Sequence, residues 1–287
     1  MNYAALIDNR KSVRAFKTKE VPASDLSVLR SFYEKGCHRL DPSLPTELTV
    51  LDAACGMALA GAAGYEEAPV GAPHYLVLLS GAGDLAGMNG GYMMEDLILK
   101  LSDMGYDSCW ITFTDAVKVK EALGLQSPLE IVAIAAFGYG EKQQKKMRLN
   151  IFSMSCVDII AQRGYYAPKK DIPELAFADR YDNIQGLDEQ IGFYEDMLWQ
   201  SLYAASKAPS YLNRQPYAFI LKDHNVVLAQ LSDPYTDALS FQLDLGIVML
   251  HFAVIAEQWM GKLTWDFESK PEVGLPDGSR VAAVYHM

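Results

Sequence analysis

The sequence has few residues of the kinds that build metal sites or disulfide frameworks. Its 287 residues include four cysteines and five histidines, all widely scattered, with no CxxC pair and no HxxxH or HExxH pattern. This spacing predicts no metal site and favours reduced thiols in a cytoplasmic protein. No Ser-His-Asp set, GxSxG elbow or paired-carboxylate motif indicates hydrolytic chemistry either.

Positive charge is also scarce. The chain carries 25 basic against 36 acidic residues, which gives a net charge of −11 and a sequence pI of about 4.9. Such a surface repels nucleic acid and anionic lipid, so neither is expected as a partner. An anionic ligand would have to be held by a local cluster of cations.

Long apolar and targeting segments are missing as well. The opening residues MNYAALIDNRKS contain a charge within eight positions and no apolar core, so no signal peptide is expected. The longest apolar stretch, LGIVMLHFAVIA (245–256), is too short to span a bilayer and includes a histidine. Half of the residues are nevertheless apolar, enough for one large domain or two modest ones.

A weak internal repeat organises what is present. Each copy predicts an arginine-bearing opening segment, a helix, a strand, a long glycine-bracketed helix and a β-branched closing strand. In the first copy these five segments lie, in order, at 3–26, 25–40, 74–80, 90–105 and 131–140. In the second copy they lie at 155–175, 194–207, 217–223, 246–261 and 280–286. Both glycine-bracketed helices are apolar nearly all round, as in helices buried on several sides. They are either one core helix per domain or a packed pair at the spine of an internal pseudo-dimer.

The run RKSVR (10–14) is the first motif that suggests chemistry. In an extended segment, alternate side chains share a face, so Arg10, Ser12 and Arg14 can point at one ligand. Two guanidiniums and a hydroxyl suit a phosphate, because forked, charged donors match its oxygens. The alternative is an ordinary solvated basic run.

Two further stretches carry polar groups in suggestive places. APSYLNRQPYAF (208–219) is a rigid, amide-rich loop before a strand, and amides suit the edge of a heterocycle such as a flavin. Its alternative is a proline-bounded connection whose amides bond to their own backbone. GYGEKQQKKMR (138–148) places cations just after a closing strand, which by itself indicates surface.

A glycine turn offers a competing interpretation. HYLVLLSGAGDLAG runs from a predicted strand into GxGxxxG, as in a dinucleotide-binding turn. That fingerprint requires a second strand with an acidic residue about twenty positions on. Here that position falls inside the helical pattern 91–104, so an NAD-dependent dehydrogenase remains only as an alternative.

Taken together, the motifs resemble the FMN-dependent nitroreductase family. NRKSVRAF is similar to its R-x-S-x-R-x-F opening, and AASKAPSYLNRQPYAFIL to its A-P-S-x-x-N-x-Q-P-W-x-F loop, with Tyr217 at the usual tryptophan. GYDSCWI (105–111) is similar to G-L-G-T-C-W-I, and AAFGYGEKQQKKMR to its closing G-Y-P with basic residues. The resemblance implies an α+β nitroreductase-like fold with two similar halves, 1–152 and 153–287, forming an internal pseudo-dimer around two central helices.

The resemblance also implies a flavin site and its residues. The phosphate of FMN would be held by Arg10, Ser12, Lys146 and Arg148, with Arg14 nearer the pyrimidine end of the flavin. The second half would close the site with Pro209, Ser210, Asn213 and Gln215, and backbone near Trp110 and Thr112 would face flavin N5 and O4. The implied activity is ping-pong hydride transfer from NAD(P)H through FMN to nitroaromatics, quinones or similar acceptors. A flavin-binding or storage protein without turnover is the alternative.

The motif order departs from the family, in which all motifs lie within about two hundred residues. In the first half, DPSLPTELTV (41–50) stands where the A-P-S loop belongs, and it has Thr46 and Leu48 at the positions of Asn213 and Gln215. The chain therefore looks like a fused dimer in which the first half keeps the phosphate clamp and the second half keeps the loop.

The second half shows the opposite loss. Its Arg163 matches Arg10, but Tyr165 and Ala167 replace the serine and the second arginine. We therefore expect one FMN per chain and a monomer in solution, with Lys169 and Lys170 as surface charges.

Overall fold

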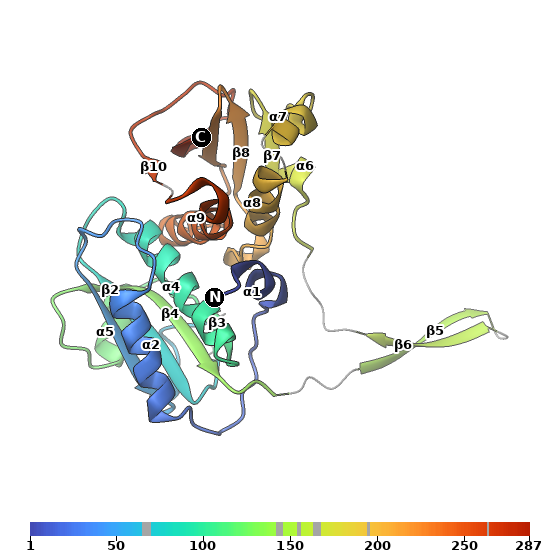
Figure 1. Ribbon diagram of the computed structural model, residues 1–287. Helices are drawn as coiled ribbons and strands as arrows, with labels where there is room; N and C mark the ends of the chain where they lie inside the picture. Colours follow the sequence, from blue (N-terminus) through green and yellow to red (C-terminus); the bar gives the residue numbers. More distant parts are fainter. Residues whose placement is uncertain (65–69, 142–145, 154–155, 163–167, 194–195, 263) are drawn as a thin grey trace.

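The computed structural model of the chain describes residues 1–64, 70–141, 146–153, 156–162, 168–193, 196–262 and 264–287. Two mixed layers of sheet and helix face each other, with the helices α4 and α9 crossing between them (Figure 1). The fold is α+β, as predicted.

The first sheet is wholly antiparallel. Its strands are β1 (Thr46–Asp52), β2 (His74–Ser80), β3 (Asp107–Ile111) and β4 (Glu130–Gly138), in the order β1-β2-β4-β3. The helices of this half are α1 (Tyr3–Asn9), α2 (Ala23–Lys35), α3 (Ala54–Ala58), α4 (Ala86–Asp103) and α5 (Ala116–Ala122). In a dinucleotide-binding unit the strands before and after the helix are neighbours in a parallel sheet, whereas here β4 lies between β2 and β3 and is antiparallel to both. This arrangement does not fit the dehydrogenase interpretation of the glycine turn after β2.

The second sheet repeats this order and adds one strand. Its strands are β7 (Ala176–Ala178), β8 (Tyr217–Lys222), β9 (Asn225–Gln230), β10 (Trp265–Asp266) and β11 (Arg280–His286), in the order β10-β11-β9-β8-β7. Strands β8 to β11 correspond to β1 to β4, and β7 pairs parallel with β8. Its helices are α6 (Ile172–Leu175), α7 (Leu187–Phe193), α8 (Met197–Ser206), the 3₁₀ turn η1 (Tyr211–Asn213) and α9 (Ala238–Met260). The matching order confirms two similar halves.

The predicted register of the repeat was wrong in two places. The counterpart of β8 is β1 at 46–52, not the strand at 74–80, because 46–52 alternates polar and apolar residues and pairs with β2. The predicted likeness of 155–175 to 3–26 also fails locally. Residues 3–9 form a helix, whereas the β-branched run 156–162 forms strand β6.

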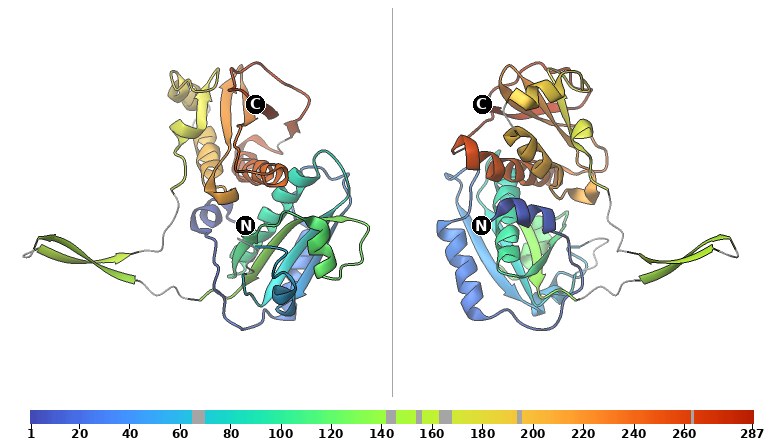
Figure 2. Two further views of the ribbon diagram at one scale, coloured as in Figure 1. Left: turned by 180° about the vertical axis from the view of Figure 1, so that it is seen from behind. Right: turned by 45° about the vertical axis from the view of Figure 1, so that its right-hand side comes forward.

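The predicted boundary between the halves falls within a separate hairpin. Strands β5 (Lys146–Ser153) and β6 (Cys156–Gln162) pair antiparallel with each other and, within the described ranges, with no other strand. In each view the hairpin lies apart from both sheets (Figure 2). The division at residue 152 stays a prediction.

The two central helices pack directly on each other, through glycine. A Cβ at Gly91 of α4 would lie 2.3 Å from the carbonyl oxygen of Leu243, and one at Gly246 of α9 would lie 1.9 Å from that of Met88. Only glycine allows two backbones to approach this closely. Of the two interpretations of these helices, the packed pair is therefore correct.

Helix α9 is longer than the apolar stretch judged too short to cross a membrane. It has 23 residues and is the one helix in the described part of the chain long and apolar enough to span a bilayer. Within its most apolar window 67% of the residues are buried inside the protein, mostly against α4, α8 and the second sheet. These are the properties of a core helix.

Candidate functional site

The RKSVR run is extended, as predicted, and lies along the edge of the first sheet. Helix α1 ends at Asn9, Ser12 forms a parallel bridge with Ser108 of β3, and the N–H of Val13 donates to the Ser108 carbonyl at 2.9 Å. Val13 is buried, Ser12 half-buried and Arg14 exposed, which is the alternation of an extended segment. Alternate side chains of this run can therefore serve one ligand.

Arg10 is the buried cation of the run. Its side chain is only 8% exposed, and its Nε lies 3.4 Å from Oε1 of Glu95, a carboxylate on α4. That Nε is buried and makes no hydrogen bond to any described residue. A buried guanidinium nitrogen without a partner is costly, so an acceptor at this point would stabilise the protein.

The APS loop (208–216) reaches the same region from the second half, and residues 168–170 lie against it. Lys169 Nζ donates to the Ala208 carbonyl at 2.8 Å, and Asn213 Nδ2 donates to the Pro168 carbonyl at 2.8 Å. Pro209 and Ser210 are half-buried between these contacts. The segment that follows the hairpin is therefore built into the candidate site.

The amide of Gln215 is fully engaged by the protein. Gln215 is buried, its Oε1 accepts from the N–H of Lys170 at 2.8 Å, and its Nε2 donates to the Ser206 carbonyl at 3.0 Å. These contacts match the alternative interpretation, in which the amides bond to nearby backbone. In this structure Gln215 shapes the loop, and its predicted contact with the flavin stays a prediction.

The APS loop holds an unusual backbone conformation. Leu212, Asn213 and Gln215 have φ of 47°, 57° and 47°, a left-handed region that is disfavoured outside glycine. The Ser210 hydroxyl accepts from the N–H of Gln215 at 2.9 Å, and buried Asp244 of α9 accepts from the N–H of Tyr211 at 2.9 Å. Strain that is held by several independent contacts is typical of binding sites.

Lys169 was expected at the surface, and the structure corrects this. Burial and, to a smaller extent, the nearby positive charge of Arg10 lower the pKa of its ammonium to about 8, while Asp244 and Glu95 oppose the shift. The buried Arg10 and the half-buried Lys169 thus lie near each other beside the APS loop. No local pattern predicts this position of Lys169, because its partners come from positions distant along the chain.

Trp110 connects the first sheet to the same cluster. Its Nε1 donates to Oε2 of Glu95 at 2.8 Å, and its ring packs against the hydrophobic cores on both sides of the central helices. Thr112, two residues on, is exposed, and its carbonyl accepts from the N–H of Gly64 at 2.7 Å. Trp110 and Arg10 therefore both contact Glu95, whereas the carbonyl of Thr112 already accepts a hydrogen bond from Gly64.

Lys146 and Arg148 are not brought to this cluster by any observed contact. Both lie on β5, whose side chains are outside the described part of the structure, and the hairpin stands apart from the sheets (Figure 2). Arg163, Tyr165 and Ala167 are outside the described residues. The predicted role of Lys146 and Arg148 in phosphate binding stays a prediction.

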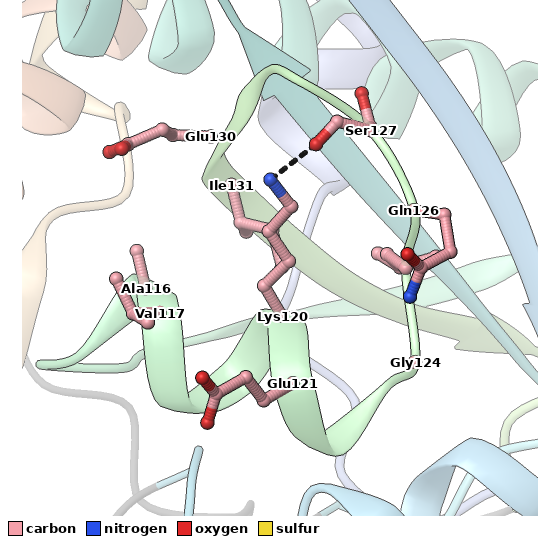
Figure 3. A pocket seen from close by; sticks show the side chains of 10 residues that line it. Ala116, Val117, Lys120, Glu121, Gly124, Gln126, Ser127, Glu130 and Ile131 are labelled. Atoms are coloured by element: carbon pink, nitrogen blue, oxygen red, sulfur yellow. Dashed lines mark hydrogen bonds between the residues drawn. The ribbon is translucent and has the colours of Figure 1, made fainter.

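Two surface hollows can be compared with this cluster. One of about 350 Å³ adjoins it and is lined by α1, the end of α4 and the start of β3, including Arg10, Lys11 and Ser108. A larger hollow of about 700 Å³ lies over α5 and shares no lining residue with the predicted site (Figure 3). There Lys120 Nζ donates to the carbonyls of Ser127 and Leu129, at 2.6 and 2.7 Å. Its ammonium group therefore stabilises the loop 127–129. The smaller hollow meets the predicted site at Arg10.

Comparison with known proteins decides the family. A family model described as "Putative TM nitroreductase" matches residues 2–256. The chain belongs to this nitroreductase family. No curated protein matches the sequence.

A solved structure agrees with the nitroreductase assignment at the level of fold, and two others align with only part of the chain. A "putative nitroreductase" from Thermotoga maritima MSB8 aligns over 99% of this chain and 92% of its own, with a TM-score of 0.58 and 16% identity. A nitroreductase family protein from Clostridium novyi NT covers 51% of this chain and 89% of its own, at a TM-score of 0.44 and 22% identity. An FMN-dependent nitroreductase from Clostridium difficile R20291 covers 48% of this chain and 88% of its own, at a TM-score of 0.41 and 18% identity.

Proposed function

We propose that this chain is an FMN-dependent oxidoreductase that passes hydride from NAD(P)H to electron-poor acceptors such as nitroaromatics or quinones. The observation that carries the proposal is the buried Arg10, whose Nε makes no hydrogen bond to the described residues, near the half-buried ammonium of Lys169. These groups lie in a chain of the nitroreductase family. Both cations call for an anion, and the phosphate of FMN is the one that the family resemblance implies.

The residues present fit the phosphate end of FMN. Arg10 offers a forked donor, Lys169 a point charge, and Ser12 a half-buried hydroxyl on the same extended run. Bonds from charged donors to phosphate are short and about twice as strong as neutral ones. A phosphate here would give Arg10 Nε an acceptor and would offset the repulsion between the two cations.

The remaining residues fit the flavin ring. Bound FMN supplies the two-electron chemistry. Arg14 is exposed close to β3, where a cation favours negative charge on the pyrimidine end of the ring. Asn213 and the strained backbone around it shape the second-half wall. Because reductant and acceptor would share one face, we expect ping-pong kinetics.

The clamp predicted from Lys146 and Arg148 competes with one built on Lys169. The double variant Lys146→Ala/Arg148→Ala and the single variant Lys169→Ala separate them in an FMN titration. We expect the loss of affinity in Lys169→Ala. Equal loss in both variants would show that the hairpin also reaches the phosphate.

The pure protein provides the first test of function. We expect a yellow protein with flavin bands that oxidises NADH or NADPH when a quinone or nitroaromatic is added. Bound flavin without acceptor-dependent turnover would instead support the storage alternative. A colourless protein that fails to bind added FMN would contradict both.

Assembly follows from the packing of the two halves. Because α4 and α9 already bury each other within one chain, we propose a monomer with one FMN. Sedimentation velocity should give the mass of a single chain, and a tight dimer would contradict the monomer but not the site.

A further inference from the structure

Two ionisable side chains face each other in the core, where the central helices cross. Glu95 of α4 and His251 of α9 are both 0% exposed, and Glu95 Oε1 lies 3.0 Å from His251 Nε2. Burying a charged pair is costly and often contributes little to stability. Phosphate binding by Arg10 and Lys169, and the wall formed by the APS loop, do not explain why Glu95 and His251 are paired in the core.

The hydrogen bonds of His251 determine the charges. Its Nδ1 lies 3.1 Å from the carbonyl of Ala204, which can only accept, and its Nε2 faces the Glu95 carboxyl group. Both bonds form when both ring nitrogens carry a proton. Burial raises the pKa of Glu95, but Arg10, His251 and Trp110 together bring it below its ordinary value. Glu95 is therefore an anion between the guanidinium of Arg10 and the ring of His251.

Glu95 also contacts residues from both ends of the proposed flavin site. Its Oε1 is 3.4 Å from Nε of Arg10, at the phosphate end, and its Oε2 accepts from Nε1 of Trp110 at 2.8 Å, at the N5 and O4 edge. A single carboxylate thus fixes two first-half residues and is itself held by a second-half histidine.

We propose that Glu95 and His251 are positioning residues that fix Arg10 and Trp110 for FMN across the contact between the two halves. This inference rests on the proposed function. It means that the second half contributes to the phosphate clamp as well as to the opposite wall.

The variant Glu95→Gln tests this with little change in shape. The amide oxygen can still accept from Trp110, and the amide nitrogen can donate to a neutral His251, which keeps its bond to Ala204. We therefore expect FMN to bind roughly ten-fold more weakly because Arg10 is misplaced, as measured by fluorescence titration.

A double variant distinguishes positioning from general structural damage. If Glu95 acts through Arg10, then Glu95→Gln should weaken FMN binding in the parent and cause no further loss in Arg10→Ala. Additive losses would overturn the proposal. Should Glu95→Gln not fold, His251→Gln is tested in the same two backgrounds, and it should show the same pattern.

The control is Asn89→Ala, which removes another fully buried polar side chain from α4. Asn89 accepts from the N–H groups of Leu40 and Asp41 and has no observed contact with Arg10 or Trp110, so FMN affinity should be unchanged. If Arg10→Ala itself leaves FMN affinity intact, the proposed clamp fails. If Arg10→Ala weakens binding and Glu95→Gln does not, only the positioning role fails.

Discussion

The two loops that lead into the corresponding strands β1 and β8 share an anchor but differ in their conformation and contacts. In the first half, Asn89 of α4 accepts from the N–H groups of Leu40 and Asp41; in the second, Asp244 of α9 accepts from that of Tyr211. Each anchor lies two residues before the glycine at the helix crossing. Corresponding positions of the central helices therefore hold corresponding loops.

What the anchors hold is different. In the first half, Thr46 already opens β1, and its hydroxyl is bonded to Arg39 Nη1 at 2.6 Å and to the Tyr33 hydroxyl at 2.9 Å. In the second half β8 begins only at Tyr217, which leaves a loop with three left-handed residues and Lys169 against it. The first loop has become strand and is fastened to its own half, so it offers no comparable polar wall.

The feature that both halves share gives the largest expected effect. Gly246→Ala places a methyl group 1.9 Å from the backbone oxygen of Met88, where neither helix can give way. We expect a loss of about 3 kcal/mol in the free energy of unfolding, the upper end for overpacking. Denaturant unfolding measures it. As a control, Gly192→Ala in α7 meets open space and should stabilise by about 0.5–1 kcal/mol. An unchanged midpoint for Gly246→Ala would mean that the central helices do not touch.

Removing an arginine from each half tests which half binds the phosphate. Arg10→Ala should weaken FMN binding by roughly ten- to a hundred-fold, because a hydrogen bond to a charged group contributes about 1.5–3 kcal/mol. Arg39→Ala removes the guanidinium that fastens the first-half loop and should leave FMN affinity unchanged. Equal effects of the two variants would indicate that the first-half loop also faces a flavin.

Because the pKa of Lys169 is lowered, we expect FMN affinity to depend on pH. Without ligand its pKa is about 8, and a bound phosphate favours the charged form and raises that pKa. FMN affinity should thus be complete below pH 8 and fall by up to about ten-fold per pH unit above it. The FMN phosphate, with a second pKa of about 6, keeps its charge in this window.

Titrations of FMN between pH 7 and 9.5 check this dependence. Lys169→Met should bind FMN weakly with a flat profile, and Lys169→Arg should keep its affinity to higher pH. A parent profile that is flat up to pH 9.5 would place Lys169 away from the phosphate. For folding the sign is opposite, because the unfolded chain binds this proton more tightly, so this group makes stability rise with pH above about 8.

Local patterns predicted the fold better than they predicted the site. The nearly all-apolar character of α4 and α9 indicated buried helices and offered their packing on each other as one of two interpretations, and alternation indicated the extended run at Arg10. The strand β1 was missed because its first residues matched a loop motif, although Leu48 and Val50 alternate with polar residues. Motif likeness outweighed the period-two pattern there, and the pattern was the better guide.

The contacts at the site depend on residues that are far apart in the sequence. Lys169 is buried only because segments around positions 10, 208 and 244 converge on it. The pairing of Glu95 with His251 left one trace, since each is an ionisable residue in a helix that is apolar nearly all round. A period or a motif cannot show that two such residues meet.

The smallest expected effect is a factor of two in the number of FMN molecules bound per chain. This number tests the comparison of the halves most directly. A reciprocal site would need cations opposite the first-half loop, and Lys169 and Lys170 were the candidates for them. The structure places both against the APS loop instead, where Lys170 Nζ donates to the Gln215 carbonyl at 2.8 Å. The polar groups of Thr46 and Arg39 are bonded to each other. We therefore expect one FMN per chain, measured as flavin released on denaturation after reconstitution with excess FMN. If the ratio of FMN to chain stays near one in Arg39→Ala, the contact between Arg39 and Thr46 is not what prevents the first-half loop from binding flavin. A ratio near two in the parent protein would show that both halves bind flavin.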